Sequence, residues 1–134
     1  MDPHRRAAGV KWFHALGQQS GQKARQHIAA AFAADHGVYL IRKGHRTVAA
    51  APDGRLAVNT TGNDGMAKGG SGDVLTGLIA ALLCQGANAR DAAALGVWLH
   101  GRAGELLEEE MTAYCASPLA LVERGLPRAF RELC

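Results

Sequence analysis

The first clear pattern of apolar and polar positions lies in residues 20–37, where apolar side chains recur at helical spacing. Ser20 stands at the position of an N-cap, and Gly37 follows the last periodic residue, so both ends of a helix are marked. The pattern predicts a helix that covers another element. The stripe that we expect to be buried comprises Ala24, Ile28, Ala31 and Phe32.

Strand-like patterns follow this helix directly. The run Val38–Lys43 is short and rich in β-formers, and we expect it to be a central strand of a parallel sheet, forming half of a βαβ unit with the helix. The runs Thr47–Ala51 and Arg55–Thr60 flank the sequence Pro-Asp-Gly, which favours a turn because glycine tolerates positive φ. These two runs predict a β-hairpin.

Two longer helices are predicted in the second half of the chain. Residues 71–85 form an apolar helix closed by Gly86, and residues 91–110 form another with a cap near Asn88. The stripe of the second helix that we expect in the core comprises Leu95, Trp98, Leu99 and Ala103.

Of the two ends of the chain, only the C-terminal one shows a recognisable secondary-structure pattern. Ser117, followed by proline, opens a last helix that runs to about Glu132, because serine at the N-cap and proline at the next position suit a helix start. Residues 1–17 show no period and stay unassigned. The predicted domain therefore spans residues 18–134.

Composition narrows the class of protein. The length of 134 residues and the 48% hydrophobic content fit one soluble globular domain, and no stretch approaches the about 20 apolar residues of a membrane helix. Residues 1–46 hold eight basic and two acidic residues, a charge of +6, and residues 47–134 hold seven and ten, a charge of −3. The basic part lacks the aromatic-studded strand or clustered Lys/Arg face of a nucleic-acid site. The three cysteines show neither a zinc nor a disulfide pattern and predict reduced thiols in the cytoplasm.

Glycine is concentrated just before and inside the predicted 71–85 helix. Glycines at a helix N-terminus expose unpaired backbone N–H groups, and the helix dipole adds about half a positive charge there, so a phosphate fits. The loop is not a Walker A motif, since no Gly-Lys-Ser/Thr follows, and it lacks the dinucleotide fingerprint, since Leu75 stands at the third glycine position. The glycines are Gly62, Gly65, Gly69, Gly70, Gly72 and Gly77.

Asp73 lies in the first turn of this helix, where a carboxylate would repel a phosphate unless it had a task of its own. One such task is to deprotonate a hydroxyl that attacks a phosphoryl group held by the amides of residues 70–72. The alternative is that Asp73 only complements the helix dipole, an effect of about 0.3–1 kcal/mol. The flanking loop that begins at Asn63 favours the catalytic role.

Three segments carry a resemblance to a known family: KGHRT, GNDGMAKGGSGDVLTGLIAALLCQG and LGVWLHGRAG. Together they resemble the C-terminal half of the ADP- or ATP-dependent NAD(P)H-hydrate dehydratases, of the ribokinase-like superfamily, over about Ala34 to Leu133. The resemblance implies an α/β fold, the C-terminal portion of a ribokinase-like doubly wound sheet with a β-hairpin and C-terminal helices. In this family ADP or ATP, with Mg²⁺, activates the C6 hydroxyl of the hydrated cofactor as a phosphate ester, and elimination restores NADH or NADPH.

The resemblance also implies roles for individual residues. Asp73 matches the catalytic acid/base that contacts the hydroxyl of the hydrate, and residues 70–72 match the anion hole. Residues 43–47 match the segment that meets the adenine nucleotide, with an exposed basic turn as the alternative, and Asn63 and Gly65 match the loop that closes over it. The expected nucleotide-binding residues are Lys43, Gly44, His45, Arg46, Thr47, Asn63, Gly65, Gly70, Ser71 and Gly72; no metal-ligating residue is assigned.

Some residues depart from this pattern or stay outside the expected site. His100 matches a family position, but a single helical histidine is more often a packed or solvated residue than a ligand. Met66 is expected to be a loop anchor or gap-filler rather than a redox-active residue. The chain reads ASPL at 116–119 where many relatives read ASDL, and its DPHR at 2–5 offers no good counterpart of the family's PHPGE segment.

The expected partners are NAD(P)H hydrate and an adenine nucleotide, with neither nucleic acid nor membrane. The family's N-terminal half has no counterpart in this sequence, so we expect a pocket open on one side, and either a homo-oligomer or a missing N-terminal half as partner. Two other functions stay open. One is a small-molecule kinase of the same superfamily that phosphorylates a vitamin precursor through Asp73, and the other is an inactive half-domain that binds nucleotide.

Overall fold

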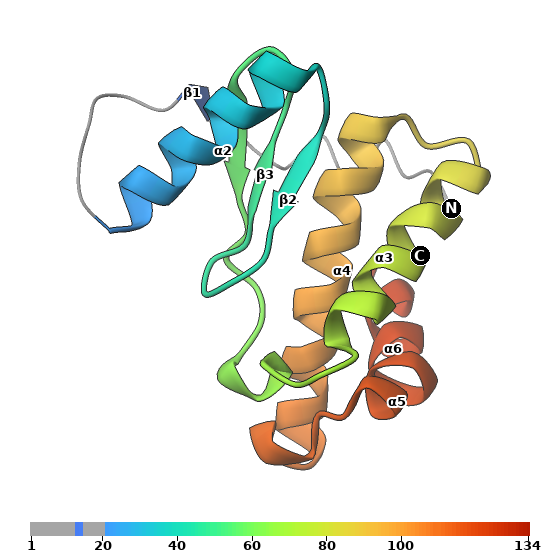
Figure 1. Ribbon diagram of the computed structural model, residues 1–134. Helices are drawn as coiled ribbons and strands as arrows, with labels where there is room; N and C mark the ends of the chain where they lie inside the picture. Colours follow the sequence, from blue (N-terminus) through green and yellow to red (C-terminus); the bar gives the residue numbers. More distant parts are fainter. Residues whose placement is uncertain (1–12, 15–20) are drawn as a thin grey trace.

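The structure, a computed structural model, describes residues 13–14 and 21–134. In the described part, a small sheet with one helix on its face lies beside a group of helices arranged around α4 (Figure 1). The strands are β1 (Phe13–His14), β2 (Leu40–Arg42), β3 (Val48–Ala50) and β4 (Arg55–Val58). The helices are α2 (Gln22–His36), η1 (Asp64–Met66), α3 (Ser71–Cys84), α4 (Ala89–Glu110), η2 (Ala113–Cys115), α5 (Pro118–Ala120), η3 (Leu121–Gly125) and α6 (Leu126–Arg131).

The strands lie in the order β1-β4-β3-β2, and each pair is antiparallel. The predicted hairpin is confirmed: Gly54 has a φ of +82°, and its N–H donates to the Ala51 carbonyl oxygen at 2.9 Å. The prediction of a central parallel strand at Val38–Lys43 is wrong for the described residues, because β2 is half-buried and pairs antiparallel with β3. The connection between β2 and β3 is a short turn, which can join antiparallel neighbours but is too short for a parallel crossover.

Helix α2 covers the sheet with a different face from the one predicted. Ala29, Ala30 and Ala33 are its buried residues, whereas Ile28 and Phe32 are 60% and 45% exposed. Alanine lets a helix approach a sheet closely, and this packing prevails over the burial of the larger side chains on the neighbouring face. The predicted C-terminal glycine, Gly37, is confirmed in the left-handed conformation. The N-cap is Gly21, and Ser20 lies outside the described residues.

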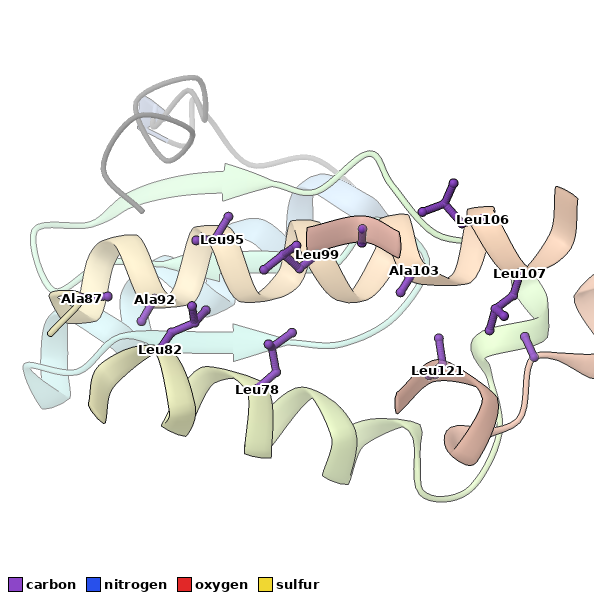
Figure 2. Packing of buried hydrophobic residues seen from close by; sticks show 12 residues of the cluster. Leu78, Leu82, Ala87, Ala92, Leu95, Leu99, Ala103, Leu106, Leu107 and Leu121 are labelled. Carbon is purple, nitrogen blue, oxygen red and sulfur yellow. The ribbon is translucent and has the colours of Figure 1, made fainter. Parts of the chain in front are cut away.

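Helices α3 and α4 contribute to a hydrophobic core that is separate from the one between α2 and the sheet. Both helices were predicted to within two residues of their bounds. Asn88 caps α4 by accepting from the N–H of Asp91 at 2.9 Å. Leu78 and Leu82 of α3 point toward α4, whose Leu95 and Leu99 lie in the same cluster (Figure 2). In the described part of the chain, no helix has both the length and the apolar character needed to cross a membrane.

The last predicted helix is confirmed, with an interruption that the sequence analysis did not predict. The hydroxyl oxygen of Ser117 accepts from the N–H of Ala120 at 3.1 Å, as expected for the N-cap. Residues Leu121–Gly125 then form a π-helical turn before α6. Pro127 lies just beyond this turn and lacks the N–H of a regular helix, which is a known cause of such irregularities. The wider turn brings Gly125 against the backbone of Ala103 in α4.

Candidate functional site

A cavity of about 520 Å³ lies between the sheet and the helical group, within the usual size range of small-molecule sites. It is lined by the β2–β3 turn, the loop from β4 into η1, and a part of α4 together with Leu75 of α3. The predicted site residues that line it are Lys43, Gly44, His45, Arg46, Thr47 and Asn63. Lining residues absent from the predicted site include Asn59, Thr61, Asp64, His100 and Gly101.

The β2–β3 turn is held in place by the start of α2. Nη2 of Arg25 donates to the Lys43 carbonyl oxygen at 3.0 Å, and Nε2 of Gln22 donates to the Arg46 carbonyl oxygen at 3.3 Å. The Arg25 guanidinium also fills the space that a side chain on Gly44 would need. Arg46 has a φ of +56°, which is uncommon for a residue other than glycine. The turn thus forms a fixed and basic wall of the cavity.

The N-terminus of α3 lies beside this basic wall. A Cβ added to Gly72 would lie 3.7 Å from Nζ of Lys43, so the ammonium group approaches the first turn of the helix. Lys43 precedes the β3–β4 hairpin in the sequence, and Gly72 follows it. The structure therefore brings together the two segments that the sequence analysis expected to bind a charged ligand.

The predicted anion-hole residues 70–72 and Asp73 are absent from the lining of the cavity. Gly70 has a φ of +90° and precedes the first turn of α3. The N–H of Ser71 donates to the Lys68 carbonyl oxygen at 3.2 Å, and the N–H of Asp73 donates to the Gly70 carbonyl oxygen at 3.1 Å. These two amides are therefore engaged within the loop. The Asp73 carboxylate is exposed at the start of the helix, where a ligand in solution can reach it.

Behind this loop, the side chain of Ser71 meets His100 of α4. Both residues are buried, at 1% and 5% exposure. Nε2 of His100 lies 2.9 Å from the Ser71 carbonyl oxygen and 3.2 Å from the Ser71 hydroxyl oxygen. The sequence analysis left His100 out of the site, and its only signal there was its place in the LGVWLHGRAG segment.

The loop after β4 is bonded to backbone carbonyls of α4. Nδ2 of Asn59 donates to the Val97 carbonyl oxygen at 2.9 Å, and the Thr61 hydroxyl donates to the Trp98 carbonyl oxygen at 3.1 Å. This close approach requires glycine at position 101, because a side chain there would collide with Thr61. A polar run that ends a strand was the sequence signal for these residues, but the run did not indicate its partners.

The next residues of the same loop also lie against α4. Nδ2 of Asn63 donates to the Gly104 carbonyl oxygen at 2.9 Å, while its Oδ1 is buried without a hydrogen-bond partner in the described part of the structure. Met66 packs over Gly104, which confirms its prediction as a loop anchor. Gly65 does not line the cavity; it allows the loop to touch the backbone of Ala113 in η2.

Acidic residues near the cavity are few. The described residues contain no group of three or more His, Cys, Asp or Glu side chains placed to hold a metal ion. Asp64 lines the cavity, and Asp73 stands at the start of α3. Mg²⁺ is usually held by one or two carboxylates together with substrate phosphates and water, so this donor set fits Mg²⁺ only in the company of a phosphorylated ligand.

The glycine-rich start of α3 meets the basic β2–β3 turn, as the resemblance to the ribokinase-like superfamily implied. Comparison with known proteins supports this class of fold and narrows it to one family. The sequence profile of NAD(P)H-hydrate dehydratase matches residues 8–126, and the chain belongs to this family.

Individual relatives agree with this assignment. A bifunctional NAD(P)H-hydrate repair enzyme Nnr of Moorella thermoacetica is 55% identical over 84 residues, which are 63% of this chain and 16% of that protein. An ADP-dependent (S)-NAD(P)H-hydrate dehydratase of Bacillus subtilis is 42% identical over 93 residues, which are 69% of this chain and 34% of that protein. The chain thus spans a minor part of these curated relatives.

A solved structure supports the fold. The ADP/ATP-dependent NAD(P)H-hydrate dehydratase of Bacillus subtilis, co-crystallized with ATP/Mg²⁺ and soaked with CoA, matches with a TM-score of 0.79 and 38% sequence identity. The match covers 84% of this chain and 42% of that one. The predicted fold class, the C-terminal portion of a ribokinase-like α/β domain, is confirmed.

Proposed function

We propose that this chain supplies the adenine-nucleotide site of an NAD(P)H-hydrate dehydratase, with ADP or ATP bound between the β2–β3 turn and the N-terminus of α3. The observation that carries the proposal is the approach of the Lys43 ammonium to Gly72. A lysine and a helix N-terminus both stabilise phosphate oxygens, and here they converge on one place. The Bacillus subtilis relative was co-crystallized with ATP/Mg²⁺, which supports the same ligand class.

The lining of the cavity suits the rest of a nucleotide. Lys43, His45 and Arg46 make one wall basic, and the carboxylate of Asp64 offers a single site for Mg²⁺ bound to phosphate. The unpartnered Oδ1 of Asn63 is an acceptor that calls for a donor. A hydroxyl or amino group of the nucleotide would satisfy it, either directly or through a water molecule.

Asp73 is the proposed acid/base. ADP or ATP, when bound, would donate its terminal phosphoryl group to the C6 hydroxyl of the hydrate and leave as AMP or ADP, and elimination of the ester would release phosphate. Asp73 accepts the proton of that hydroxyl, and its exposed position at the start of α3 leaves it free to do so. The basic wall at Lys43 stabilises negative charge nearby without occupying the carboxylate.

An inactive nucleotide-binding half-domain is the second candidate. It is favoured by the lining of the cavity, which includes neither Asp73 nor residues 70–72. This candidate keeps the nucleotide site at Lys43 and the N-terminus of α3, but it lacks turnover.

Two measurements on the full chain test these proposals. The first is thermal unfolding with and without millimolar ADP or ATP and Mg²⁺; a ligand at 100 times its Kd stabilises by about 2.7 kcal/mol. We expect Lys43→Met to lose most of this effect. Arg131→Met, which removes an exposed cation at the end of α6, serves as the matched control and should keep it.

The second measurement is turnover of NAD(P)H hydrate, followed by the absorbance of reduced nicotinamide. Stabilisation together with turnover supports the dehydratase. Stabilisation without turnover supports the half-domain, and a stable phosphorylated alcohol from a vitamin precursor would indicate a kinase instead. If neither nucleotide stabilises the chain, the proposed nucleotide site is wrong.

We also propose a cytoplasmic location. Cys84 and Cys134 are free thiols in the structure, which suits a reducing compartment. Localisation of a tagged chain by fractionation would test this directly.

A further inference from the structure

The hydrogen bonds of His100 define its tautomer. Nε2 lies 2.9 Å from the Ser71 carbonyl oxygen, and a carbonyl oxygen can only accept, so Nε2 carries a proton and donates it. The Ser71 hydroxyl oxygen, 3.2 Å from Nε2, shares this donor as a second acceptor. The imidazole is thereby fixed in orientation between α4 and the first turn of α3.

The surroundings of His100 keep this imidazole neutral. Burial lowers the pKa of His100 to about 4, and the nearby Lys43 ammonium acts in the same direction. The other ionisable residues that line the same cavity are His45 and Arg46 of the β2–β3 turn and Asp64 of η1. At neutral pH, His100 therefore provides a donor at Nε2 without adding a further charge to a basic cavity.

The same turn of α4 supports two sides of the cavity. His100 bonds to Ser71 at the start of α3, while the adjacent Gly101 lies against Thr61 in the loop after β4. The position of the first turn of α3 relative to that loop is thus set by two neighbouring residues of one helix.

We propose that His100 is a positioning residue: its imidazole ties the first turn of α3 to α4 and so places Gly72 beside Lys43. The proposal rests on the proposed function only in its effect on nucleotide binding and turnover. The tie itself is a property of the fold and has a readout that needs no ligand.

Three substitutions test the proposal in the full chain. His100→Gln keeps an N–H donor close to the place of Nε2, whereas His100→Leu removes the donor and leaves the Ser71 carbonyl without this partner. Leu106→Ala is the matched control, because Leu106 is a 5% exposed core residue of the same helix that does not line the cavity. All three are compared with the parent at equal temperature below their unfolding transitions.

The ligand-free readout is NMR. In the parent, the ¹⁵N shifts of the His100 ring should show a protonated Nε2. In His100→Leu, amide hydrogen exchange at Ser71 and Asp73, whose N–H groups donate to the Lys68 and Gly70 carbonyls, should be faster by about tenfold than in Leu106→Ala, which corresponds to about 1.4 kcal/mol. His100→Gln should stay within about threefold of the parent. A protonated Nδ1, or equal exchange in His100→Leu and Leu106→Ala, would overturn the proposal.

The ligand readout is the affinity for ADP with Mg²⁺, measured by calorimetry. We expect His100→Leu to bind about tenfold more weakly than the parent and His100→Gln to recover most of this loss. Unchanged affinity in His100→Leu contradicts the proposed link between the tie and the nucleotide. If the parent itself does not bind ADP, the proposed function fails, and the NMR comparison alone decides whether His100 positions the loop.

Discussion

The backbone N–H of Gly62 donates to Oε1 of Glu105 at 3.0 Å, joining the loop after β4 to the side of α4. The other oxygen of Glu105 accepts from Nη1 of Arg102 at 3.1 Å. Arg102 in turn donates to both carboxylate oxygens of Glu132, at 2.9 and 2.8 Å. One loop of the cavity is therefore connected through three charged side chains to the end of the chain.

This relationship predicts the effect of Glu105→Ala. The substitution leaves the Gly62 amide without its charged acceptor, so we expect a loss of about 1 kcal/mol in unfolding free energy and a nucleotide affinity about fivefold lower. Urea unfolding and calorimetry measure the two quantities. Glu109→Ala removes another carboxylate partner of Arg102, 58% exposed and not bonded to the loop, and should change affinity little. Equal losses of affinity in both variants would contradict a specific role for the Gly62 bond.

Two glycines should respond to alanine in opposite directions. A side chain on Gly104 would collide with Met66, so Gly104→Ala should destabilise the fold by about 1–3 kcal/mol. Gly77 lies within α3 with nothing near its Cβ position, so Gly77→Ala should stabilise by about 0.5–1 kcal/mol through helix propensity. Thermal or urea unfolding distinguishes the signs. Destabilisation by both variants would show that α3 packs more tightly at Gly77 than the structure indicates.

Asp73→Asn should separate binding from chemistry. The amide cannot accept the hydroxyl proton, so turnover of the hydrate should fall by at least ~10²-fold, while the affinity for ADP or ATP stays within a few fold. Steady-state turnover and calorimetry test the two parts. Asp35→Asn, an exposed carboxylate of α2 outside the cavity, is the control. Comparable rates for Asp73→Asn and the parent would remove Asp73 as the base.

Stability should decrease as the pH falls through the acidic range. Burial and the Lys43 ammonium lower the pKa of His100 from 6.5 to about 4, so between these values the unfolded chain binds a proton that the folded chain does not. Above both values His100 contributes no pH dependence. The loss accumulates as the pH falls toward about 4 and reaches about 3 kcal/mol at roughly 1.36 kcal/mol per pKa unit.

His100→Gln removes the titrating group, so its unfolding free energy should vary less with pH than that of the parent. Urea unfolding at several pH values between about 7 and 4.5 measures both slopes. Identical slopes would show that His100 titrates alike in the folded and unfolded chain.

The sequence predicted the helices α3 and α4 and the β3–β4 hairpin because their signals are local. Asn88 at a helix start and Pro-Asp-Gly in a turn act through bonds within a few residues. The buried face of α2 was predicted wrongly, because Ile28 and Phe32 are the more hydrophobic residues but the alanines fit the sheet. That choice depends on the partner surface, which no helical period can reveal.

The site residues likewise divide into those that local motifs indicate and those whose contacts depend on the fold. The glycine-rich helix start and the basic turn were visible as motifs, whereas the approach of Lys43 to Gly72 depends on how the hairpin folds back between them. The tie from His100 to Ser71 was not predicted, because a single histidine in an apolar helix carries no signal of its partner. Asn59 and Thr61 were missed for a related reason: they donate to backbone carbonyls of α4. Every residue has a backbone carbonyl, so the sequence does not indicate which of them is the acceptor.

The cavity lies between two separately packed clusters, one around α2 and the sheet and the other around α4. Lys43 lies in the β2–β3 turn next to the first cluster, and Gly72 lies in the first turn of α3, a helix of the second cluster. Any anion that bridges them gains affinity only in the relative placement in which both are within reach, so binding and the docking of the two clusters are thermodynamically linked. By reciprocity, a substitution at the junction that favours this placement raises affinity without touching the ligand.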